Sequence, residues 1–104
     1  MAYFGSTTAL GAGETFSQQR QSDRSDNVGG SVFSSTGGNL YVEQSGDGSN
    51  WDLQTTVAVT ANTGTKWGDT VVLPYLRVRF VPTGGAAATT FRLFGRFTSA
   101  GTEQ

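Results

Sequence analysis

The segment of this sequence best suited to metal or turn chemistry is residues 45–52, which read SGDGSNWD. Oxygen ligands at alternate positions can hold Ca²⁺, but Asp47 and Asp52 are the only carboxylates here, and Asp-Gly is typical of a tight hairpin turn. We therefore predict a turn rather than a metal site. The eight acidic residues of the chain also show no pattern that would build a cleft around a pair of glycosidase carboxylates.

Three aromatic residues are candidates for stacking on a sugar ring: Tyr41, Trp51 and Trp67. Neighbouring Asp, Asn or Gln side chains would then accept hydrogen bonds from sugar hydroxyls. Because a small domain usually uses its Trp side chains to fill the core, we favour core or edge packing for all three. Carbohydrate binding stays open as the alternative.

Two C-terminal segments, residues 75–80 and 91–97, alternate apolar and polar side chains with the period of two that a half-buried strand requires. The residues predicted to face the core are Leu76, Val78, Phe80, Phe91, Leu93 and Phe97. The residues predicted to face outward are Tyr75, Arg77, Arg79, Arg92, Phe94 and Arg96.

The outward set is our candidate interface. If Phe80 pairs near Phe91, then Arg79 lies opposite Arg92, and directly opposed like charges destabilise a sheet. The same register sets Arg77 opposite Phe94, and Tyr75 opposite Arg96. Carboxylates from a neighbouring copy would relieve the repulsion, and mixed Arg and aromatic residues are enriched at interfaces. The alternative is a solvated face on which Arg stems cover the rings.

The composition excludes several classes of protein. The chain has no Cys and no His, which excludes a disulfide scaffold, a Cys/His zinc site, the common haem and iron–sulfur ligands and a His-dependent catalytic triad. We expect no enzyme activity, no metal and no cofactor. A pI near 5.1 is the wrong sign for a surface that binds phosphates, so we also expect no nucleic acid partner.

Short β-branched and aromatic stretches separated by Gly, Ser, Asn and Asp indicate an all-β protein. Seven or eight strands at spacings near ten residues predict an antiparallel β-sandwich or jelly roll. The expected strands are residues 14–20, 28–34, 39–44, 51–59, 70–73, 75–81 and 90–98. Pro74 lies between two of them and marks a bend or an edge.

The 104 residues predict a single domain over residues 1–104, with loose ends at 1–6 and 99–104. The first residues lack the basic and apolar regions of a secretory signal, and no apolar run is long enough to span a membrane. We therefore expect a protein that is made and kept soluble, with no membrane contact.

Self-association is expected on two grounds. A domain this small without disulfides has a limited core, which oligomerisation commonly supplements. The charge is also uneven: residues 1–52 carry six acids and two Arg, whereas residues 53–104 carry five bases and two acids. Contacts between unlike halves of neighbouring copies would fit this distribution, and so would pairing within one copy.

The segments GSVF (residues 30–33), GNLYVEQSGDGSNWD (38–52) and PYLRVRF (74–80) resemble small all-β virion proteins of tailed bacteriophages. The resemblance extends over residues 30–97. It is nearest in size and composition to capsid decoration (cement) proteins, and it implies a structural, non-enzymatic role. It also implies a homo-oligomer, a trimer by preference, that is made in the host cytoplasm and binds the major capsid protein on the outer surface of the virion. No catalytic residues come with it. The alternative is a tail or baseplate module that binds a receptor or a carbohydrate.

Overall fold

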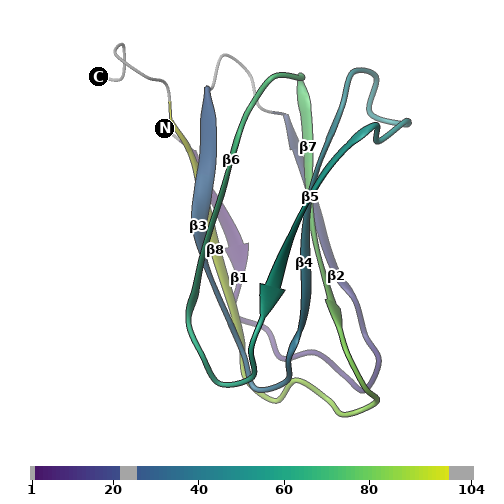
Figure 1. Cartoon of the computed structure of the whole chain (residues 1–104), viewed down its shortest axis with the longest axis vertical. Helices are drawn as coiled ribbons and strands as arrows, with labels where there is room; N and C mark the ends of the chain where they lie inside the picture. The colour runs from purple at the N-terminus through teal and green to yellow at the C-terminus, as the bar shows by residue number, and fades with distance from the viewer. Residues whose placement is uncertain (1, 22–25, 99–104) are drawn as a thin grey trace.

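The computed structural model describes residues 2–21 and 26–98, which form eight β-strands in two sheets that face each other (Figure 1). The order in the first sheet is β1 (Ala2–Ser6), β8 (Phe91–Thr98), β3 (Asn27–Ser34) and β6 (Thr65–Thr70). The order in the second sheet is β2 (Phe16–Gln21), β7 (Tyr75–Pro82), β4 (Gly38–Ser45) and β5 (Leu53–Val59). All pairings between these strands are antiparallel, which confirms the predicted all-β sandwich.

The order of the strands makes this sandwich a jelly roll. Among the described strands, only β4 and β5 are consecutive neighbours in one sheet, and every other consecutive pair is divided between the two sheets. The hairpin between β4 and β5 is the one predicted from the Asp-Gly turn. The described residues include no helix long and apolar enough to cross a membrane.

The core follows from the alternation of side chains along the strands. The inward residues predicted for β7 and β8 are all buried, among them Leu76, Phe80 and Phe91. Aromatic rings join the sheets: the ring centroids of Phe80 and Phe91 are 5.3 Å apart, and those of Phe16 and Phe91 are 5.4 Å apart. Offset and tilted ring pairs at these separations add to the stabilisation that burial provides.

Gly95 makes room for the aromatic cluster at the other end of the core. It occupies an inward position of β8, and a Cβ placed there would lie 2.5 Å from Cζ of Phe4 and 2.9 Å from Cζ2 of Trp67. Phe4 and Trp67 are both buried, with ring centroids 6.2 Å apart. A glycine in the strand therefore marks a close approach of large side chains.

Two expectations about the strands are wrong. Residues 1–6 were expected to form a loose end, but β1 pairs with β8 over five residues, and Phe4 belongs to the core. A strand was expected at 70–73, but the strand is β6, at Thr65–Thr70. The sequence of β6, TKWGDT, has one large apolar residue, and so its alternation was not visible. The other expected end, residues 99–104, lies outside the described residues.

Gln44 explains why the apolar residues 71–73 are not a strand. Its side chain is fully buried, and its Oε1 accepts hydrogen bonds from the backbone N–H groups of Val72 (2.8 Å) and Leu73 (3.1 Å). Its Nε2 donates to the backbone oxygen of Thr70 at 2.8 Å. One amide side chain thus takes the place of a ladder partner and holds the connection between β6 and β7.

Candidate functional site

The six residues of the predicted interface lie on opposite sides of the molecule. β7 belongs to one sheet and β8 to the other, so Phe80 does not pair with Phe91 and Arg79 does not lie opposite Arg92. The alternation was interpreted correctly, but it shows which side chains share a face and not which strands are neighbours. Two separate outer faces result. We call them the β7 face, with Tyr75, Arg77 and Arg79, and the β8 face, with Arg92, Phe94 and Arg96.

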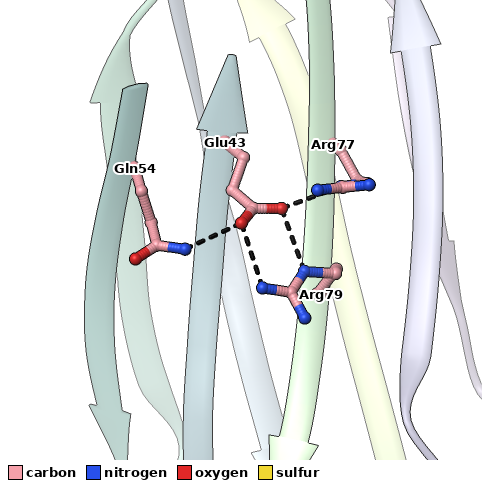
Figure 2. A network of polar contacts seen from close by, with 4 residues as sticks. All are labelled: Glu43, Gln54, Arg77 and Arg79. Atoms are coloured by element: carbon pink, nitrogen blue, oxygen red, sulfur yellow. Dashed lines mark hydrogen bonds and ion pairs between the residues drawn. The ribbon is translucent and has the colours of Figure 1, made fainter. Parts of the chain in front are cut away.

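On the β7 face the carboxylate expected from a neighbouring copy comes from the same chain. Glu43 of β4 is opposite Arg77 in the ladder, and its side chain is only 4% exposed. Arg77 Nε donates to its Oε1 at 2.8 Å, and Arg79 donates from Nε at 2.9 Å and from Nη2 at 3.0 Å (Figure 2). Gln54 of β5 completes the network with a bond of 2.7 Å from its Nε2 to Oε2. The carboxylate thus accepts hydrogen bonds on both oxygens.

The network keeps Glu43 ionised. Burial by itself raises the pKa of this carboxyl, but the hydrogen bonds from Arg79, Gln54 and Arg77 outweigh it and lower the pKa to about 2. The same pairing raises the pKa of the Arg79 guanidinium. A carboxylate this acidic and this fully bonded is unsuited to general acid or base catalysis near neutral pH.

The aromatic candidates for sugar stacking are already in contact with arginine or with the core. The guanidinium of Arg77 lies 4.3 Å from the ring centroid of Trp51, and that of Arg79 lies 5.0 Å from the centroid of Tyr41. Trp67 is buried beside Phe4, as predicted. The guanidinium groups of Arg77 and Arg79 therefore cover one side of each of these two rings.

Residues 45–50 form the predicted turn. Asp47 Oδ1 accepts hydrogen bonds from the backbone N–H groups of Ser49 and Asn50, each at 2.8 Å, and Oδ2 accepts one from the Asn50 amide at 2.7 Å. The Ser45 hydroxyl donates to Asp47 and accepts from the N–H of Gly48, which has a positive φ of 81°. These bonds hold the pKa of Asp47 well below its usual range. The lone pairs that a metal would use are thus already engaged in the turn.

The β8 face has a different chemistry. Phe94 is 50% exposed, and the guanidinium of Arg92 lies 4.4 Å from the ring centroid of Phe33. Beside Phe94 is a hollow of about 470 Å³. Its lining comes from β3, β6 and β8 and includes the outward side chains of Ser31, Lys66 and Phe94, so it opens on the outside of the sheet. Gly29 lies between Arg96 and Gly68 in the ladder and contributes no side chain to the lining of the hollow. Glycines in strands were not singled out from the sequence, although adjacent glycines in a strand are the signal that points to such a hollow.

Residues 1–98 match the family model described as "Uncharacterised protein YqxG N-terminal domain". The chain belongs to this family. It is also similar to the solved structure of PBSX exported protein XepA, with a TM-score of 0.85 and 22% sequence identity. That match covers 99% of this chain and 39% of XepA, so the chain spans well under half of the XepA structure. A structure described as "CBM4 structure and function" aligns with a TM-score of 0.43 and 19% identity, over 92% of this chain and 67% of that one. The curated proteins contain no match.

The two faces of this YqxG N-terminal domain suit different tasks. On the β7 face, the charges of Arg77 and Arg79 are engaged by Glu43 within the chain. On the β8 face, the outward positions of β3, β6 and β8 hold Lys66, Arg92 and Arg96 and no acidic residue. Asp69 of β6 points the other way and accepts a hydrogen bond from the Gln44 amide. The outward positions of the β8 face therefore combine basic side chains with the half-exposed ring of Phe94, whereas on the β7 face Glu43 pairs with both arginines.

Proposed function

We propose that the chain is a non-enzymatic structural protein of a phage-related particle, a decoration protein that binds the capsid as a homo-oligomer and stabilises the shell. Two findings support the proposal. The fold is shared with the phage-related exported protein XepA, and the sequence resembles small virion proteins over residues 30–97. A jelly roll is also a frequent architecture of capsid domains.

The β8 face is the observation on which the proposal rests. An exposed Phe94 beside three basic side chains has the composition of an interface core, where aromatic residues and Arg are enriched. A decoration protein works by binding alone, because contacts that bridge neighbouring capsid subunits oppose expansion of the shell. Such a role needs a rigid scaffold and a partner surface, and it needs no catalytic group.

The β7 face supports the absence of catalysis in this proposal. Its buried acid, Glu43, is held ionised by two arginines and an amide. The arginine stacks on Trp51 and Tyr41 also make these rings less suited to a sugar than an open aromatic platform. We therefore favour the capsid role over a carbohydrate-binding tail or baseplate module.

Particles purified from the source of this chain test the role directly. We expect mass spectrometry to find the chain in the particle, and cryo-electron microscopy to place it on the outer capsid surface. Density on the tail or baseplate would contradict the decoration role, and absence of the chain from the particle would contradict the proposal as a whole.

The Phe94→Ala variant tests the surface. We expect it to weaken particle binding by about 1–3 kcal/mol, as for an aromatic residue at the centre of an interface. The matched control is Val72→Ala, which also shortens an exposed apolar side chain but lies outside the β8 face. Melting of the free protein should change little in either variant. Equal occupancy of the parent and Phe94→Ala would show that the interface lies elsewhere.

A further inference from the structure

The hollow on the β8 face has the size of a ligand site. Pockets that take small ligands or a few side chains commonly have volumes of about 300–1,000 Å³, and this hollow has about 470 Å³. Its lining combines the phenyl ring of Phe94 with polar donors from Ser31, Lys66 and Arg96. Among the described strands, β6 is the edge of its sheet, and no described strand pairs with Gly68 on the side away from β3.

The ladder shows why the hollow exists. The row of outward positions across β8, β3 and β6 reads Arg96, Gly29, Gly68, so two adjacent positions have no side chain. The next row reads Phe94, Ser31, Lys66 and forms one wall. A backbone or a side chain of a partner can therefore approach the sheet closely at the glycines while its other groups meet the wall.

The positive charge of the β8 face favours an acidic partner. Of the seven basic residues in the chain, three lie on the outward positions of β3, β6 and β8, together with no acid. The rest of the chain then has eight acidic and four basic residues. A long polyanion such as a nucleic acid would extend past the β8 face and meet this excess of negative charge, whereas a short acidic segment would not.

From this arrangement we infer that the hollow over Gly29 and Gly68 binds an acidic, partly apolar peptide segment of a partner protein. Carboxylates of the segment meet Lys66 and Arg96, and an apolar side chain packs on Phe94. This inference deepens the proposed function, since it names the chemistry that the β8 face recognises on its partner. It depends on the geometry of the hollow and on charge complementarity.

A fluorescence titration tests the inference. The indole of Trp67 is buried on the core side of β6, so binding is followed by the fluorescence anisotropy of a dye attached to a peptide probe rather than by tryptophan emission. The probe is a short synthetic peptide of alternating glutamate and leucine. We expect a saturable rise in the anisotropy of the peptide as protein is added, and weaker binding when salt is added. A peptide of the same length with lysine in place of glutamate should give no such rise.

Variants of the protein, titrated against the same labelled peptide, separate a specific site from a general charge effect. Lys66→Glu should weaken binding of the peptide about tenfold or more. Arg20→Glu changes the net charge equally but lies on β2, in the opposite sheet, and should leave binding within about twofold. Ser31→Tyr fills the hollow without changing the charge and should abolish binding. Melting curves establish that each variant is folded.

Several results would overturn the inference. The first two concern the peptides: the glutamate peptide does not bind, or the lysine peptide binds equally well. The third is an equal loss of binding in Lys66→Glu and Arg20→Glu. The fourth is tighter binding of a single-stranded oligonucleotide of the same charge. The proposed function fails separately. A protein that binds the peptide but is absent from particles contradicts only the particle role, and a protein found in particles that ignores the peptide contradicts only this inference.

Discussion

Replacing Glu43 by glutamine should reveal how much the β7 face contributes to stability. The pKa of this carboxyl falls from an ordinary value of 4.5 to about 2 in the folded protein. A tenfold change in proton affinity corresponds to about 1.4 kcal/mol, so the ionised form stabilises the fold by about 3 kcal/mol. Glu43→Gln removes the charge while keeping the size of the side chain. We expect the free energy of unfolding at pH 7 to fall by about 3 kcal/mol.

The pH dependence gives this prediction its sign. The folded-state pKa is depressed, so the stabilisation is present above pH 4.5 and is lost as the pH falls through about 2. Urea unfolding of the parent and of Glu43→Gln at equal protein concentration, at several values from pH 7 to pH 2, should show two curves that converge at the acid end. The matched control is Asp52→Asn, which neutralises an exposed carboxylate.

Two outcomes would refute the reasoning about Glu43. If Glu43→Gln is as stable as the parent at pH 7, then the cost of burying the charges cancels the attraction between them, as it does for some buried ion pairs. If Glu43→Gln is less stable than the parent by the same amount at every pH, then the loss comes from packing and not from ionisation. Convergence at low pH is the result that only the charged network explains.

Three further predictions concern the core, the turn and self-association. Gly95→Ala should destabilise the fold by about 1–3 kcal/mol in urea, because its methyl group would meet Phe4 and Trp67, whereas Gly46→Ala, with open space around it, should not. Asp47→Ala should lower the melting temperature slightly and by the same amount in calcium and in chelator, and a drop caused by chelator in the parent alone would restore the metal-site interpretation. Sedimentation equilibrium at micromolar protein should give a multiple of 10.9 kDa, with a trimer expected from the resemblance, and a mass of one chain would contradict self-association.

The sequence predicts the elements of this fold better than their partners. Alternation along residues 75–80 and 91–97 identified both strands and their buried sides, since a period of two has one physical meaning. It could not show that β7 and β8 belong to different sheets, because the connection between them crosses the sandwich. The sequence did not predict β1 and β6, because each is short and contains glycine. Pairing with neighbouring strands, rather than local strand propensity, makes these segments strands.

For the candidate site, the sequence predicted which side chains face outward but not which residues they contact. Phe94 was expected to face outward, and it is half exposed. The neutralisation of Arg77 and Arg79 was not expected, because it depends on which residue of β4 stands opposite them in the ladder. Gln44 carried no signal at all, since a buried amide that binds backbone groups looks in the sequence like any polar residue at a strand end.

The contrast between the two outer faces suggests how a partner would choose between them. A carboxylate that approaches Arg77 or Arg79 must compete with Glu43, which already satisfies the Nε of each guanidinium at 2.8 and 2.9 Å. It gains little in exchange for its own lost hydration. A carboxylate that approaches Lys66 meets a face whose described outward positions hold no acid, next to an apolar ring that is half exposed. The sequence predicts that opposed arginines require a partner. In the structure Arg77 and Arg79 are paired with Glu43, so the face better suited to a partner is that of the sheet that contains Phe94.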